Sequence, residues 1–190
     1  MSSAGPDSQT STLLDLIGLI YDAVPDQSRW PAFLEALAQA THCTRATLIL
    51  NTSGERWAIV SYHGWQDHEI HHYHENHAAR DPWGLASMAV PEGEVRASHE
   101  LCSQEELEQS AAYRDFYGPR DCIFGFGGMI LKTDSGASAI ALVRGKAQGP
   151  CGEREKSLLQ PLLPHLRRAA LLQAELASLR ARRSGESSSS

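Results

Sequence analysis

The chain has 190 residues, of which 42% are hydrophobic and 21% are charged, close to the proportions of soluble globular proteins. This excludes a fibrous or a predominantly disordered chain and predicts one domain with its own core. The formal net charge of -6 disfavours a surface that follows nucleic-acid phosphates, because such surfaces need clustered Lys and Arg. We expect no direct nucleic-acid binding by this chain alone.

Residues 1–10 and 184–190 are rich in small and polar residues, and both are predicted to be disordered tails. Apolar residues at helical spacing predict an amphipathic helix over residues 11–24. Ser28 as a cap and Pro31 in the first turn predict the start of a second helix. Two helices are therefore expected to open the domain.

Two hairpins are predicted further along the chain. The first joins the β-rich runs 45–51 and 56–62 through a turn at Thr52-Ser53-Gly54-Glu55. The second joins residues 123–132 and 137–144. Together they predict an antiparallel sheet of four strands or slightly more.

The β pattern disappears between residues 65 and 118. Helical stretches are predicted there over residues 67–79 and 103–117, in an insertion that covers one face of the sheet. Within the strand that follows, three glycines mark a bulge or a place where a ligand or a packed helix approaches the backbone. They are Gly125, Gly127 and Gly128.

A helix is predicted over residues 153–183, with apolar residues alternately four and three apart. Its regular part is expected to start at Pro164, since proline interrupts a helix. For the segment before Ala170, packing against the chain's own sheet and pairing with a second copy are equally expected. Beyond it, three residues are predicted to pair with a second copy of the chain, as a dimerisation and signalling helix: Leu172, Leu176 and Leu179.

Four short segments carry the most specific local pattern. They are Ser28-Arg29-Trp30-Pro31, Tyr73 with Asp81-Pro82, Asp115-Phe116-Tyr117 ahead of Pro119, and Leu163-Pro164-His165-Leu166. Together they resemble the N-terminal sensor half of LuxR-family helix-turn-helix transcription regulators. The resemblance implies an α+β fold of the GAF/PAS type, an antiparallel sheet flanked by helices with a long C-terminal helix, in which residues 11–152 form the sensor domain.

The resemblance also implies a homodimer that binds a small molecule. The DNA-binding module of the family is absent from this chain, which is then either the sensor part of a longer regulator or a standalone protein. In the lactone-binding members the Trp and Tyr at the ligand lie one helical turn apart, whereas Trp65 and Tyr73 are eight residues apart. Lactone recognition is therefore not carried over.

Aromatic residues concentrate in the insertion and its flanks, where they are available to line a pocket or to form an ordinary core. The predicted ligand-binding residues are Tyr62, Trp65, Tyr73, Asp81, Trp83, Phe116, Phe124 and Phe126. No nucleophile motif such as G-x-S-x-G is present, so we expect neither an enzyme nor a bound cofactor.

Two alternatives remain open. The first is a ligand-free protein-interaction module that acts through the dimer helix. The second is a metal or haem sensor, because His68, His71 and His72 share a helix face. A solvated polar face is the simpler account of these histidines, because no H-E-x-x-H or Cys-His spacing is present.

The four cysteines, Cys43, Cys102, Cys122 and Cys151, are far apart in the sequence and include no C-x-x-C pair. The N-terminus lacks the pattern of a signal peptide, and no apolar run has the length of a membrane span. We expect a soluble, cytoplasmic protein with reduced thiols.

Overall fold

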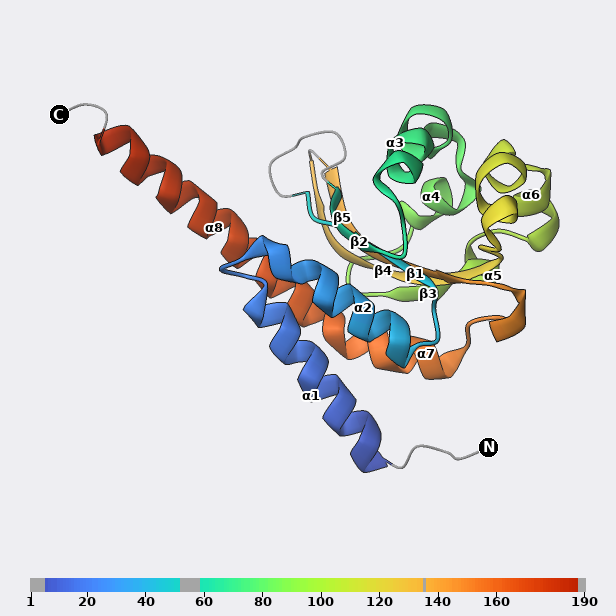
Figure 1. The fold of residues 1–190 in the computed structure, drawn as a ribbon, viewed down its shortest axis with the longest axis horizontal. Coiled ribbons are helices and arrows are strands. Elements are labelled where there is room, and N and C mark those ends of the chain that lie inside the picture. The colour runs from blue at the N-terminus through green and yellow to red at the C-terminus, as the bar shows by residue number, and fades with distance from the viewer. Residues whose placement is uncertain (1–5, 52–58, 135, 188–190) are drawn as a thin grey trace.

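The structure is a computed structural model that describes residues 6–51, 59–134 and 136–187. Its centre is a five-stranded antiparallel sheet with the strand order β2-β1-β5-β4-β3. Figure 1 shows the sheet between two groups of helices. The strands are β1 (Arg45–Ile49), β2 (Ile59–His63), β3 (Val95–Ala97), β4 (Phe124–Thr133) and β5 (Gly136–Arg144).

The helices follow the predicted order. The first group is α1 (Pro6–Asp22), α2 (Trp30–Ala40), α7 (Glu153–Leu159) and α8 (Leu163–Ser187). The insertion contributes α3 (Asp67–Asn76), α4 (Pro82–Ser87), α5 (Ser98–Leu101), α6 (Gln104–Gln109) and a π-helical segment, Ala112–Tyr117. This confirms the predicted α+β architecture. Among the described helices, none is both long enough and apolar enough to cross a membrane.

Both hairpins are present, β1 with β2 and β4 with β5. The turn predicted at residues 52–55 lies outside the described residues. The edge strand β3, however, falls where β structure was predicted to be absent. It is three residues long, too short for alternation along the sequence to identify it, and its pairing with residues 126–128 of β4 is what makes it a strand.

The helix ends differ from the prediction. α1 begins at Pro6 and α8 ends at Ser187, so helix covers part of both stretches predicted as disordered tails, 1–10 and 184–190. Extending an existing helix by a turn costs much less free energy than starting one. A prediction from composition does not include this difference. Residues 1–5 and 188–190 lie outside the described residues.

The other two helix boundaries are set by local chemistry. Ser28 does not cap α2 but lies in a 3-10 turn ahead of it, where Asp26 accepts hydrogen bonds from the Ser28 backbone N–H and hydroxyl. The predicted interruption of the last helix is found, as a 3-10 turn over Gln160–Leu162 that separates α7 from α8. Pro31 occupies the first turn of α2 as predicted.

One face of the sheet, here called the helix face, packs against α1, α2, α7 and α8. Its core is continuous and dense with large side chains, among them Leu16, Ile20, Phe33, Leu34, Leu48, Ile140, Leu142, Leu159 and Leu166. Gly128 belongs to this face, because a Cβ there would lie 2.6 Å from Cδ2 of Leu163. This glycine therefore lets α8 lie close against β4, as predicted for a packed helix.

Candidate functional site

The opposite face of the sheet, here called the cavity face, carries small residues at its centre. Side chains alternate along a strand, so Ala139 and Ala141 of β5 point away from the helix face. The register places Ala141 between Thr47 of β1 and Gly127 of β4. Ala141 is exposed although β5 has a strand on either side. The centre of this face is therefore hollow.

A cavity of about 390 Å³ occupies the hollow, within the range of small-molecule sites. The sheet is its floor and the insertion forms its walls. Most of the lining is apolar, with aromatic rings from Trp65, Tyr73, Trp83 and Phe116. The polar residues of the lining include Thr47, Asn51, His74, Asp81, Arg96 and Ser98.

The aromatic wall is held by ring contacts. Phe116 stacks on Trp65 with ring centroids 5.3 Å apart and packs against Tyr73 at 5.1 Å. Two guanidinium groups cover the wall, that of Arg45 at 4.6 Å from the Trp65 ring and that of Arg120 at 4.4 Å from the Phe116 ring. Such cation-π contacts add to the burial of the rings, so the wall is a fixed surface.

Asp81 joins the elements of the wall. Its side chain is 1% exposed, and its Oδ2 accepts hydrogen bonds from the hydroxyls of Tyr73 at 2.7 Å and Tyr117 at 2.8 Å. Oδ1 accepts from the backbone N–H of Trp83 at 3.0 Å and so caps α4. Three separate segments of the insertion meet at this carboxylate.

The two phenols remain donors to Asp81 at any ordinary pH. Burial and the nearby Asp81 charge raise the pKa of Tyr73 well above its usual value. Burial and the proximity of Tyr73 and Asp81 do the same for the pKa of Tyr117. Asp81 is therefore engaged by its own wall, and we assign it to holding the walls together.

Of the eight predicted ligand-binding residues, six contribute to the lining: Trp65, Tyr73, Asp81, Trp83, Phe116 and Phe126. Phe126 does so from β4, although its side chain belongs to the helix-face core. Tyr62 and Phe124 lie outside the lining. Tyr62 instead donates a hydrogen bond to Asp67, and Phe124 packs against the helix-face core because it shares the strand parity of Gly128.

The floor of the cavity was predicted in part: Gly125 and Gly127 were expected to mark a bulge or a place where a ligand or a packed helix approaches the backbone, whereas the alanines were not identified. It is built by Gly125, Gly127, Ala139 and Ala141, with Thr47 beside them. The signal in the sequence is an alanine at every second position of residues 137–141. That pattern places three small side chains on one face of a strand.

The histidines of α3 do not gather as the metal hypothesis requires. His68 and His71 are exposed, and His72 instead has its Nε2 3.3 Å from Nε2 of His77. Burial and the neighbouring His72 lower the pKa of His77. Within residues 6–51, 59–134 and 136–187, no group of three or more His, Cys, Asp or Glu side chains is placed to hold a metal ion.

No protein-family model matches the sequence, and no curated protein matches it significantly. Solved structures do match. The VqsR LBD domain from Pseudomonas aeruginosa aligns with a TM-score of 0.66 at 16% identity, over 85% of this chain and 95% of that one. The fold is GAF-like.

Two further solved structures agree with that description. The GAF domain of a phosphoenolpyruvate-protein phosphotransferase from Acinetobacter aligns with a TM-score of 0.59 at 15% identity, over 90% of this chain and 95% of that one. A free methionine-R-sulfoxide reductase from Neisseria meningitidis, in complex with its substrate, aligns with a TM-score of 0.58 at 10% identity, over 93% and 96%. At these identities the likeness concerns the fold alone.

Proposed function

We propose that this chain is the ligand-sensing domain of a LuxR-like transcription regulator, and that it binds a small, mainly apolar molecule in the cavity. The observation that carries the proposal is the hollow over Ala141, about 390 Å³ in volume. Its apolar lining offers the dispersion contacts that a ligand of matching size and polarity would make. The likeness to the VqsR LBD domain supports a regulatory role.

Binding without chemistry is the simplest use of this site. The buried carboxylate of the wall, Asp81, already accepts three hydrogen bonds from Tyr73, Tyr117 and Trp83. Catalysis by a carboxylate needs an oxygen within reach of the reacting proton. The interactions of Asp81 serve the architecture of the wall instead.

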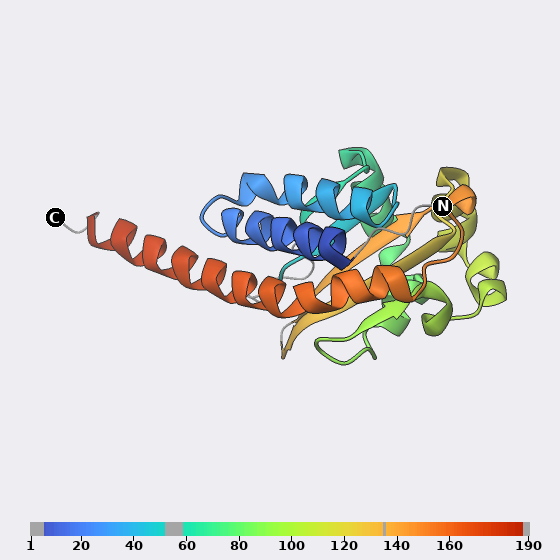
Figure 2. The ribbon, with the colours of Figure 1, turned by 90° about the horizontal axis from the view of Figure 1, so that it is seen from below.

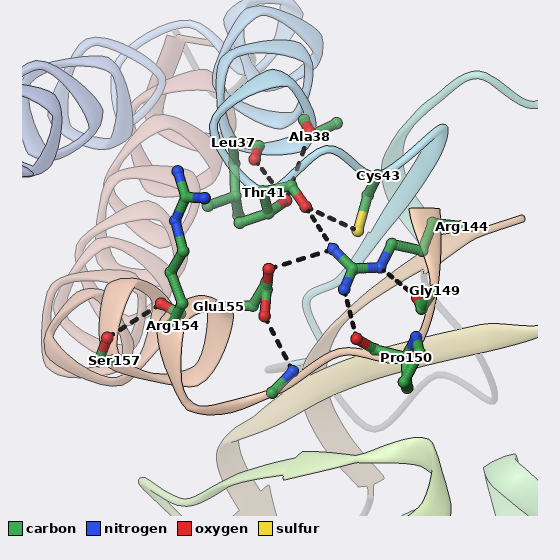
Figure 3. Close-up of polar contacts among 11 residues, drawn as sticks. Leu37, Ala38, Thr41, Cys43, Arg144, Gly149, Pro150, Arg154, Glu155 and Ser157 are labelled. Atoms are coloured by element: carbon green, nitrogen blue, oxygen red, sulfur yellow. Dashed lines mark hydrogen bonds and ion pairs between the residues drawn. The ribbon is translucent and has the colours of Figure 1, made fainter. Parts of the chain in front are cut away.

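We infer a route from the cavity to α8 through the end of β5, where Figure 3 shows the polar contacts of Arg144. Arg144, 4% exposed, follows the floor residues of β5 and bonds to Glu155 of α7, with Nη1 and Oε1 3.2 Å apart. It also donates to the carbonyl groups of Thr41, Gly149 and Pro150. A displacement of β5 by a ligand would thus reach α7, which the 3-10 turn Gln160–Leu162 joins to α8. To signal, the ligand must favour one of two such arrangements.

The output we propose is pairing of α8 with α8 of a second copy. Figures 1 and 2 show its C-terminal part extending beyond the sheet. Leu172 and Leu179 are 39% and 50% exposed, whereas Gln173 turns inward and donates to the Ala23 carbonyl at 2.9 Å. With the half-buried Leu176, the exposed leucines make a seam of four-three spacing that suits a coiled coil.

The ligand proposal is tested by thermal unfolding against a library of metabolites. A specific ligand raises the melting temperature of the wild-type chain saturably, by mass action. Ala141→Phe fills the floor and should abolish the rise. Ala32→Phe, at an exposed position of α2, is the matched control and should keep it. A rise that survives Ala141→Phe would place the ligand elsewhere, and a rise with metals alone would favour the histidines of α3.

The dimer proposal is tested by sedimentation velocity over a range of concentrations. The wild-type chain should associate, and a Leu172→Glu/Leu179→Glu variant should remain a monomer because charges at seam positions prevent packing. Ser178→Glu, at an exposed position beside the seam, is the control and should associate as the wild type does. A dimer that tolerates both leucine substitutions would contradict the seam. Association that is equally strong with and without a compound that raises the melting temperature would leave the interaction module as the better description.

A further inference from the structure

Two of the four cysteines, far apart in the sequence, meet in the folded chain. Cys43 follows α2 and Cys151 precedes α7, and Arg144 joins their two loops by donating to the carbonyls of Thr41 and Pro150. Their thiols lie close enough to interact with each other. Both belong to the helix-face core, with 8% and 2% of their surface exposed. Cys102 and Cys122 belong to the separate cluster under the insertion. The fold thus sorts four thiols into one pair and two others.

Cys43 is the residue of the pair that lines an opening. A surface cleft of about 610 Å³ is lined by Cys43 together with the exposed residues Gln39, His42 and Arg154. Cys151 does not take part in this lining. A small solute entering the cleft would therefore meet Cys43 before Cys151.

The surroundings shift the pKa values of the two thiols in opposite directions. The hydrogen bond with Cys151 lowers the pKa of the Cys43 thiol, and the positive charge of Arg144 acts in the same direction. The hydrogen bond with Cys43, followed by burial, raises the pKa of Cys151. The thiolate is the reactive form of cysteine, so the lowered pKa agrees with the position of Cys43, the residue of the pair that lines the cleft.

Arg144 links this pair to the rest of the molecule. Figure 3 shows its guanidinium close to Cys43, bonded to the Thr41 carbonyl on one side and to the Gly149 and Pro150 carbonyls on the other. These carbonyls belong to the same two loops that carry the cysteines. A covalent bond between the thiols would fasten together the loops that Arg144 now joins by hydrogen bonds.

We propose that Cys43 is a hydroperoxide-reactive residue and that Cys151 resolves its oxidised form into a reversible disulfide. The Cys43 thiolate attacks one peroxide oxygen, the O–O bond breaks, and the leaving oxygen takes a proton to depart as water or an alcohol. Cys43 is then a sulfenic acid. The Cys151 sulfur attacks the Cys43 sulfur, the S–O bond breaks, and the hydroxyl group leaves with the Cys151 proton as water.

The balance is two thiols and one hydroperoxide giving one disulfide, one water and one water or alcohol. The peroxide is reduced by two electrons and the thiol pair is oxidised by two. A thiol reductant reverses the step by exchange. This proposal concerns the helix face and stands independently of ligand binding in the cavity.

The test treats the reduced full chain with hydrogen peroxide, removes the excess with catalase and alkylates the remaining thiols after unfolding. Intact mass should show the loss of two hydrogens and alkylation at only two of the four cysteines. A proteolytic digest should contain a peptide pair joined through Cys43 and Cys151. Dithiothreitol should restore all four thiols, and failure to do so would contradict a reversible disulfide.

Variants separate the two roles. In Cys151→Ser, dimedone should trap a sulfenic acid at Cys43, while Cys43→Ser should form neither adduct nor disulfide. Cys102→Ser is the control and should behave as the wild type, since burial raises the pKa of Cys102 and disfavours its thiolate. In the wild-type chain, hydrogen peroxide should modify Cys43 at least about tenfold faster than Cys102.

The order of modification in the wild-type chain gives a second measurement that needs no variant. Site-resolved mass spectrometry over a time course should find Cys43 first and Cys151 second. Earlier modification of Cys102 or Cys122, or oxidation without a link between Cys43 and Cys151, would overturn the proposal. A Cys43 that reacts no faster than free cysteine at the same pH would overturn it as well.

Discussion

The two faces of one sheet differ in what they enclose. Along β1, Leu48 is fully buried on the helix face, whereas its neighbour Ile49 lines the cavity and is only half-buried. Along β5, Ile140 packs in the core while Ala141 is left exposed on the cavity floor. The same strands thus supply a filled core on one side and a hollow on the other.

The difference lies in side-chain size and in the elements that cover each face. Long amphipathic helices lie flat on the helix face and fill the space between their side chains and the sheet. Short helices and turns cover the cavity face, joined at Asp81. We infer that the helix face supplies most of the stability of the fold, and that the cavity face is free to bind. Four predictions test this contrast, beginning with the largest effect.

The largest expected contrast in stability is between substitutions of Arg144, which is buried, and Arg45, which is half-buried. Arg144→Met should lower the free energy of unfolding by roughly 3–5 kcal/mol, because it leaves Glu155 without its buried partner. Arg45→Met, on the other face, should cost about 1 kcal/mol, since the groups it leaves, among them the carbonyls of Gly64 and Arg120, are neutral. Urea denaturation measures both. Equal losses would show that Arg144 is no stronger a link than a surface arginine.

Neighbouring residues of β1 give the next contrast. Leu48→Ala should cost about 2–5 kcal/mol by loss of burial and creation of a void in a dense core. Ile49→Ala should cost about 1 kcal/mol or less, because it enlarges a space that is already open. Chemical unfolding of the two variants decides. A larger loss for Ile49→Ala would mean that the cavity face carries the core.

Replacing an alanine by a larger residue tests the same contrast by adding side-chain volume to each face. Ala46→Leu, at a position 1% exposed on the helix face, should cost about 1–3 kcal/mol by overpacking. Ala141→Leu should change the stability by less than about 0.5 kcal/mol, because the floor has room for the added atoms. Thermal and urea unfolding should agree on this order. A destabilised Ala141→Leu chain would contradict an open floor.

The smallest effect is an acid dependence on the helix side. Burial alone raises the pKa of Glu155, but hydrogen bonds from the Gly152 N–H and Arg144 outweigh it and hold that pKa below 4.5. The stabilisation by Glu155 is therefore complete above pH 4.5 and declines as the pH falls towards the lower pKa of the folded state. The stability difference between wild type and Glu155→Gln should shrink over that range. A difference that grows instead would mean that the folded state favours the protonated acid.

Local patterns predicted much of the architecture. The Trp30-Pro31 start of α2, both hairpins and the break near Pro164 follow from the conformational limits of single residues and their neighbours. The edge strand β3 did not follow, because three residues gain strand structure only from pairing with β4. Its position depends on a partner about 30 residues away along the chain. Such pairing requires closure of a long loop, which local propensity does not report.

The candidate site was predicted in part. Trp65, Tyr73, Asp81 and Phe116 do meet around one cavity. Which way a strand residue points is decided by register, and for this reason Phe124 packs against the other core. Of the small floor residues, Gly125 and Gly127 were noticed as places of close approach, but Ala139 and Ala141 were not, because a small side chain in a strand carries no signal of what lies above it.

By itself, the sequence determined the order of the main helices and of the four hairpin strands, since that order depends on backbone freedom and on the period of apolar residues. Only the tertiary structure decided that Cys43 lies against Cys151, that Asp81 receives two tyrosine hydroxyls, and that Ala141 stands beneath open space. Each of these depends on contacts between distant segments, which form because burying the helix face brings the segments together.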